Sequence, residues 1–235
     1  MKSLFGFLGF VTVLIVVVTA FAVPAIVAPL VASTVRAASP FGGQPLDVQV
    51  DVNALGLMRG FVGEIRVSGA QLSRDGVTVG SLAFTVRNVR IADHAFKEVL
   101  GGLDNVAIPT GTGASITVDR IALTGSSTEL VANASMDRTQ ALEFVRRAFD
   151  DQGVAVSDIV LTLGGISVVV FEQRVQLAIG VADGALVVPD LLGAGTLELL
   201  APQPDDSWRL TGVTVTTSGM EIVAALDAGR LLGSN

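Results

Sequence analysis

The sequence predicts a β-rich α+β fold, in which a long antiparallel sheet curls through repeated bulges around one principal amphipathic helix and one or two short helices. Three observations predict it. Apolar and polar residues alternate strictly over residues 46–53, which is typical of a strand with one buried face and one exposed face. A one-residue slip of this alternation recurs along the chain. Only residues 137–152 show a long apolar stripe of helical period.

The N-terminal segment is considered apart from the fold, because no charged residue occurs from Ser3 to Val35. Residues 4–23 would form a helix of about 30 Å, the thickness of a hydrocarbon core. Lys2 precedes this run, which favours an N-terminus in the cytoplasm. We therefore expect residues 1–32 to be a transmembrane anchor or a signal segment. Ala20 and Ala22 offer a small-x-small cleavage site, so both alternatives stay open.

The rest of the chain is predicted to be exported. Residues 33–45 mix small residues with Pro and Gly without periodicity, which is typical of a linker. Residues 46–235 are expected to form a single domain. We expect a single-pass protein of the cytoplasmic membrane and cell envelope, with this domain facing the periplasm or the exterior. Cleavage of the first segment would make it a secreted protein.

Strands dominate the predicted domain. After residues 46–53, alternating or short apolar runs predict strands over residues 62–69, 77–91, 115–124, 128–134, 155–163, 166–171, 174–181, 185–188, 196–200, 208–217 and 220–225. Asp183 and Gly184 lie between two such runs and predict a two-residue hairpin turn, in which both residues need positive φ.

Helical spacing occurs in two main segments. The principal helix is predicted over residues 137–152, with Gly153 just beyond its end and with an apolar stripe of Ala141, Leu142, Phe144, Val145, Ala148 and Phe149. A shorter helix is predicted over residues 94–103, with Asp93 as its N-cap and with Phe96, Val99, Leu100 and Leu103 facing inward. Residues 226–232 are a candidate for a last helical turn.

The slips have the form apolar-x-x-apolar-x-apolar. They occur at Val62-Ile65-Val67, Val86-Val89-Ile91, Val118-Ile121-Leu123, Val156-Ile159-Leu161 and Leu210-Val213-Val215. Coincidence in a valine-rich chain is the alternative, since no fixed period separates the copies. If the slips are real, one extra residue in each strand would return the apolar side chains to one face and bend the strand. A sheet that curls in this way has a concave interior, which side chains or a guest must fill.

The residue content argues against several kinds of catalytic, metal-binding and nucleic-acid-binding site. The chain has no cysteine, its one histidine is His94, and its net charge is -7 without a basic cluster. These features leave no thiolate or histidine metal site and no footprint for nucleic acid. The glycine-rich stretch at residues 109–115 and the acidic pairs at residues 150–151 and 205–206 fit ordinary turns. We expect no enzyme activity, no cofactor and no bound metal.

Several apolar positions are candidate contacts for a guest in the concave interior. They come from the predicted strands and from the helical stripe, and they are Phe84, Val86, Leu142, Val145, Phe149, Val168 and Val170. An apolar stripe on a helix that packs on a sheet is equally well explained as ordinary core.

The strand run "VGEIRVSGAQLSRDGVTVGSLAFTVRNVRI", the stretch "ITVDRIALTG" and the segment "DRTQALEFVRRAFDDQGVAVSDIVLTLGG" resemble the LmeA-like phospholipid-binding proteins of bacterial cell envelopes. The resemblance covers about Leu46 to Leu232 and lies in pattern and element order. It implies a curved sheet wrapped on helices, related in shape to tubular lipid-binding domains, and binding of a phospholipid or another two-chain lipid.

Three functions are therefore open. The first is a non-enzymatic protein that binds or handles phospholipid and holds acyl chains in an apolar groove between sheet and helix. The second is a structural or partner-docking β domain with a filled core. The third is an envelope enzyme that acts through carboxylates, which need no histidine.

Overall fold

The computed structural model describes residues 44, 46–51, 59–74, 76–90, 92, 95–109, 115–170, 172–189, 195–203 and 206–227. Residues 1–43, which contain the predicted anchor or signal segment, lie outside this description. Within the described residues, no helix has the length and apolar character needed to cross a membrane.

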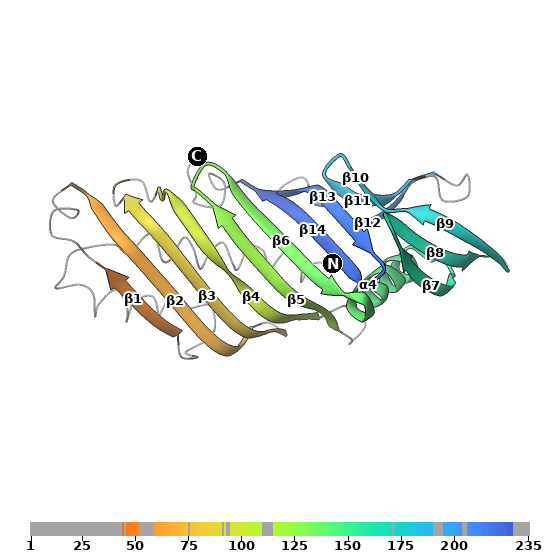
Figure 1. Ribbon diagram of the computed structural model, residues 1–235, viewed down its shortest axis with the longest axis horizontal. Coiled ribbons are helices and arrows are strands. Elements are labelled where there is room, and N and C mark those ends of the chain that lie inside the picture. The colour runs from red at the N-terminus through yellow and green to blue at the C-terminus, as the bar shows by residue number, and fades with distance from the viewer. Residues whose placement is uncertain are drawn as a thin grey trace.

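An eight-stranded antiparallel sheet forms most of the molecule, in the order β1-β2-β3-β4-β5-β6-β14-β13 (Figure 1). Its strands are β1 Leu46–Asp51, β2 Phe61–Arg74, β3 Val77–Arg90, β4 Glu98–Pro109, β5 Ser115–Gly125, β6 Leu130–Asp137, β13 Trp208–Thr216 and β14 Gly219–Leu226. The first six strands pair in chain order, whereas β14 joins from the far end of the sequence and pairs with β6 from Gly219↔Asp137 to Leu226↔Leu130.

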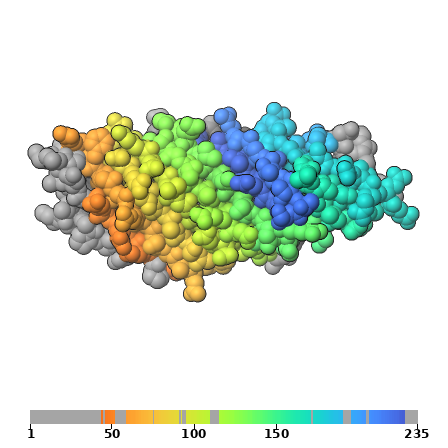
Figure 2. All heavy atoms as spheres, viewed as in Figure 1, coloured from red at the N-terminus to blue at the C-terminus, as the bar shows by residue number. Residues whose placement is uncertain are grey.

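Two three-stranded sheets lie beyond β13. One contains β7 Ser157–Thr162, β8 Gly165–Val170 and β9 Gln173–Ala178, and the other contains β10 Gly180–Ala182, β11 Ala185–Val188 and β12 Leu197–Leu200. Each is joined to β13 through a turn, because Leu210 N donates to Gly184 O at 2.9 Å and Gly164 N donates to Val215 O at 3.0 Å. The described elements therefore form one elongated body, with β1 at one end and β9 at the other (Figure 2).

The predicted principal helix and hairpin turn are both confirmed. Helix α4 runs from Arg138 to Asp151, and a reciprocal capping box between Asp137 and Gln140 begins it. It packs near the β13 end of the main sheet and contacts β5, β6, β7, β12 and β14 (Figure 1). Its buried residues are Ala141, Phe144, Val145, Ala148 and Phe149, all from the predicted stripe. At the hairpin between β10 and β11, Asp183 and Gly184 have φ of 52° and 79°.

The short helix predicted over residues 94–103 is wrong, because β4 begins at Glu98 and pairs along its length with β3 and β5. The apolar spacing of this segment also fits a strand, in which Val99, Gly101 and Leu103 share one face. The neighbouring strands need glycine here: a Cβ on Gly101 would lie 2.2 Å from Ala83 O. Leu100, predicted to face inward, is 52% exposed. Asp93, His94 and residues 228–232 lie outside the described residues.

The slips in the apolar pattern do keep the apolar residues on the buried face, but only some of them are the predicted one-residue bulges. Single extra residues shift the register in β13, around Thr211, and in β7, between Ser157 and Val160. At Asn88 and Asp119 the expected one-residue insertion is wrong. There, both paired strands leave one residue out of the ladder and pairing resumes in the same register. The apolar residues on both sides of each interruption are buried all the same.

Candidate functional site

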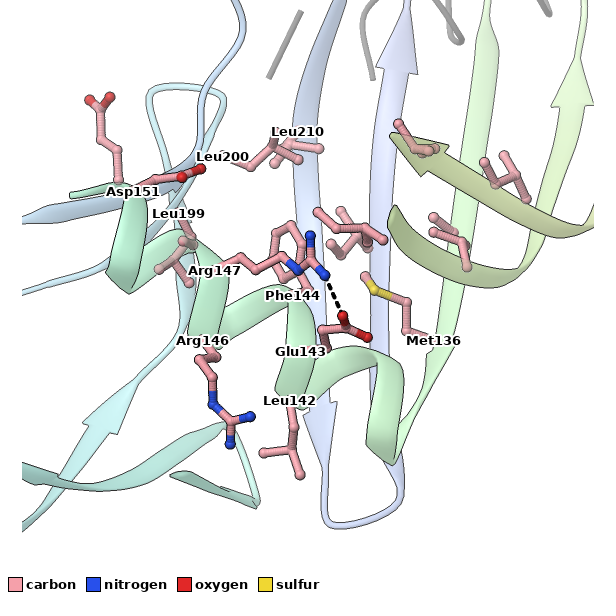
Figure 3. A pocket seen from close by; sticks show the side chains of 18 of the residues that line it. Met136, Leu142, Glu143, Phe144, Arg146, Arg147, Asp151, Leu199, Leu200 and Leu210 are labelled. Carbon is pink, nitrogen blue, oxygen red and sulfur yellow. Dashed lines mark hydrogen bonds and ion pairs between the residues drawn. The ribbon is translucent and has the colours of Figure 1, made fainter. Parts of the chain in front are cut away.

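A cavity of about 920 Å³ lies between the inner face of the main sheet and helix α4. It is partly open to solvent. Figure 3 shows the helix along one side of it and the strands behind. Its apolar lining comes from β4, β5, β6, β12, β13, β14 and α4 and consists of Ile108, Pro109, Ile116, Val118, Ile121, Ala132, Ala134, Met136, Leu142, Phe144, Ala148, Leu199, Leu200, Trp208, Leu210, Ile222 and Ala224.

Small side chains on two neighbouring strands near the β13 end of the sheet leave this space open. Ala132 and Ala134 of β6 pair with Ala224 and Ile222 of β14, so three of these four neighbouring lining positions carry only a methyl group. A β-strand presents every second residue to one face, which is why Ala132, Ala134 and Met136 all line the cavity. The alternation gives the cavity an apolar floor, and the small alanine side chains leave the space above that floor empty.

The helix contributes a charged wall above this floor. Arg147 Nη2 and Glu143 Oε1 form an ion pair at 2.5 Å, one helical turn apart (Figure 3). The Arg147 side chain is only 18% exposed, whereas that of Glu143 is 43% exposed. Further charged residues along the lining are Arg138, Arg146, Asp150, Asp151 and Glu198. The cavity is therefore amphipathic, with apolar side chains on the strands of the main sheet and charged side chains on the helix and at Glu198 of β12.

The position of Arg147 has an energetic consequence. A guanidinium beside apolar side chains loses much of its hydration, and a nearby carboxylate offsets that loss. Glu143 is this carboxylate in the structure. Because Glu143 is itself well exposed, an anionic group of a ligand could take its place and leave Glu143 hydrated by water.

The residues predicted as guest contacts are placed differently from one another. Leu142 lines the cavity, and Figure 3 shows its side chain on the helix beside Glu143. The other six do not line it: they are buried in the hydrophobic core, and they are Phe84, Val86, Val145, Phe149, Val168 and Val170. Whether any of the seven contacts a ligand stays a prediction.

Several lining residues were missing from the sequence-based set, among them Met136, Ala134, Ile222 and Arg147. Alternation marks the first three as inward-facing. Their common neighbourhood depends on the pairing of β6 with β14, whose residues are more than eighty positions apart, as in the 2.6 Å bond from Asn133 Nδ2 to Glu221 Oε1. No local pattern carries that information.

The described residues offer no group of three or more His, Cys, Asp or Glu side chains that could hold a metal ion. The perturbed ionisable groups lie away from the cavity. The guanidinium of Arg87 on β3 lowers the pKa of the Glu64 carboxyl on β2 through a hydrogen bond, and Glu64 in turn raises the pKa of Arg87.

Comparison of the chain with protein-family models, with curated proteins and with solved structures finds no match. The resemblance to LmeA-like phospholipid-binding proteins therefore stays a prediction from the sequence, and the functional argument rests on the cavity.

Proposed function

We propose that this protein is a non-enzymatic phospholipid-binding protein that holds acyl chains in the cavity between α4 and the main sheet. The observation that carries the proposal is an apolar space of about 920 Å³ with charged residues along one side. A lipid has the same two-part character, and ligand sites are commonly apolar clefts with a few placed polar groups.

The volume suits a two-chain lipid. If a methylene group takes about the volume of a water molecule, roughly 30 Å³, a cavity of about 920 Å³ holds about thirty of them. A two-chain phospholipid carries on the order of thirty methylenes, and burying each is worth about 0.8 kcal/mol. Full burial is then worth on the order of 20 kcal/mol as an upper bound, so a protein that covers most of the chains can compete with a bilayer.

The charged wall fits the other half of the ligand. In this proposal the acyl chains lie on the strands, around Ala134 and Ile222, and the phosphate lies near Arg147. An arginine binds phosphate with two parallel hydrogen bonds, which gives orientation as well as affinity. Access to such a lipid requires the domain to face a membrane, which agrees with the expected place in the cell envelope.

The test uses the full chain reconstituted in vesicles that contain a phospholipid with a photoactivatable group in one acyl chain. After illumination, tandem mass spectrometry locates the labelled residues. We expect label on residues of the cavity floor and wall, such as Met136 and Leu142. Label confined to residues 1–32, or spread over the outer face of the sheet, would contradict the proposal.

A matched pair of variants sharpens the test. Ala134→Phe puts a ring into the cavity, whereas Ala83→Phe puts the same ring on an exposed position of β3. We expect the first variant to lose most of the label and the second to keep it. If both behave like the original protein, the cavity does not hold the lipid, and a structural or partner-docking β domain becomes the better description.

A further inference from the structure

A line of unpaired residues crosses four neighbouring strands of the main sheet. The ladders skip Gln71 and Gly80 between β2 and β3, Gly80 and Asn105 between β3 and β4, and Asn105 and Asp119 between β4 and β5. Register is the same on both sides of each gap. We call these four aligned residues the crease.

The backbone at the crease is locally unusual. Gln71 and Asn105 have φ of 54° and 53°, a region that residues other than glycine seldom adopt. Gly80 lies between them, and a Cβ there would approach the Asn105 Cβ to 2.9 Å. Because each gap also removes ladder hydrogen bonds, the strands are bound to one another less strongly along this line than on either side.

The part of the sheet beyond the crease forms one wall of the cavity. This part, which we call the flap, comprises residues 72–74 of β2, 77–79 of β3, 106–109 of β4 and 115–118 of β5. Ile108, Pro109, Ile116 and Val118 line the cavity, and all four belong to the flap. The remaining floor includes residues of β6 and β14, two strands whose pairing with each other is uninterrupted.

One side chain joins the crease to the helix. Gln140 Oε1 accepts from Asp137 N at 2.9 Å, and Gln140 Nε2 donates to Asp119 Oδ1 at 2.7 Å. The same amide group therefore completes the helix cap and holds the crease residue of β5. Because Asp119 is exposed and Gln140 is half-buried, water can reach this bond and replace it, and the bond can break at little cost.

We propose that the crease is a hinge, that the flap swings about it to admit a ligand to the cavity, and that the Gln140–Asp119 hydrogen bond is a latch that holds the β5 end of the crease against the helix and so restrains this movement. The hinge and the latch concern the protein alone, and only the statement about ligand entry rests on the proposed function. A β-interruption beside a site commonly redirects the strand, and here its position separates a movable wall from a fixed floor.

Hydrogen exchange on the full chain tests the hinge without any lipid. We expect amides of Val106 and Ile108 to exchange at least tenfold faster than those of Leu103 and Val99 on the same strand, all of which are buried. Equal rates on both sides of Asn105 would overturn the hinge, whatever the protein binds.

Two conservative variants test the latch. Gln140→Glu keeps an oxygen for the Asp137 cap but places a carboxylate against Asp119, whereas Asp119→Asn keeps an oxygen that accepts from Gln140. We expect Gln140→Glu to speed exchange in the flap several-fold with little change at Ala132 or Ile222, and Asp119→Asn to leave it unchanged. If exchange became faster by the same factor over the whole sheet, the substitution would have lowered the global stability, and the latch would be overturned.

A reversible cross-link tests ligand entry. The chain has no cysteine, so an Asp119→Cys, Gln140→Cys double variant carries the only thiols. A short bis-methanethiosulfonate reagent should then join the crease to the helix and lock the hinge. With a fluorescent phospholipid bound, we expect release to acceptor vesicles to slow at least tenfold and to recover on reduction. Unchanged release from a protein that still binds the lipid overturns the gating role and leaves the proposed function standing.

Discussion

At the scale of single residues, the environment of Arg147 suggests a binding role most directly. It is the more buried partner of an ion pair on the wall of an apolar cavity. A glutamine at this position keeps much of the length of the side chain and removes its charge. The Glu143 side chain is 43% exposed, so we expect water to hydrate its carboxylate when the partner is lost.

We expect Arg147→Gln to weaken phospholipid binding about tenfold or more, because hydrogen bonds to charged groups contribute about 1.5 to 3 kcal/mol. Retention of a fluorescent phospholipid by the full chain measures this. Arg209→Gln, at an exposed position of β13 outside the cavity lining, is the control and should bind like the original protein. Equal loss in both variants would remove Arg147 from the site.

At the scale of elements, a single substitution can test whether residues 98–103 form a strand or the helix that their apolar spacing predicted. Gly101→Ala would bring a Cβ to 2.2 Å from Ala83 O of the neighbouring strand. We expect it to lower the free energy of unfolding by about 1 to 3 kcal/mol or more, the usual range for overpacking. Urea denaturation measures the difference.

The same substitution has the opposite sign in a helix, where alanine is more stable than glycine by about 1 kcal/mol. Gly212→Ala is the matched control, because a Cβ there meets Val223 only at 3.7 Å. We expect that variant to be neutral or slightly more stable. If Gly101→Ala stabilised the protein, this segment would be a helix and not a strand.

Ion pairs on the outer face join three of the strands. Arg87 of β3 contacts Glu64 of β2 at 2.8 Å and Glu98 of β4 at 2.9 Å, and Arg66 also pairs with Glu64. Arg87 holds the pKa of Glu64 below its ordinary value of 4.5. A carboxyl whose pKa is lowered by folding stabilises the folded state above its ordinary pKa, and this contribution is lost as the pH falls through the lowered value.

We therefore expect the original protein to be more stable than Glu64→Gln at pH 7, and expect the difference to vanish as the medium is acidified below the lowered pKa of Glu64. Thermal unfolding of both proteins over a pH series measures this. Added salt at pH 7 should shrink the difference, because these side chains are partly exposed. A difference that persists unchanged in strong acid would assign the effect to packing.

At the scale of the whole molecule, the sequence leaves open whether the predicted N-terminal segment is a membrane anchor or a cleaved signal segment. Intact-mass analysis of the protein isolated from its native cells distinguishes the two alternatives. An anchor predicts a chain that retains residues 1–32, whereas cleavage after Ala22 predicts one that begins at Val23. In the first case we expect extraction to require detergent, because twenty uncharged residues would stay in the bilayer.

The sequence determined the local structure well wherever periodicity and end signals agreed. The strict alternation over residues 46–53 predicted β1, and the apolar stripe together with Gly153 predicted α4. Asp183 and Gly184 predicted a hairpin turn because so few residue pairs tolerate positive φ at both positions. The slips at Asn88 and Asp119 were also visible in the sequence, because the pattern of apolar and polar residues shows which side chains are buried.

Only the tertiary structure decided which strands meet and what remains between them. The pairing of β14 with β6 joins residues that are distant in sequence. The strand at residues 98–109 and the matched interruptions along the crease depend on contacts between neighbouring strands, which the period of a single segment does not specify. The cavity belongs to this second class, because Ala132 and Ala224 leave a space only once their strands lie side by side and α4 covers them. Periodicity specifies which face of an element is apolar, and the volume enclosed by several such faces is a property of their packing.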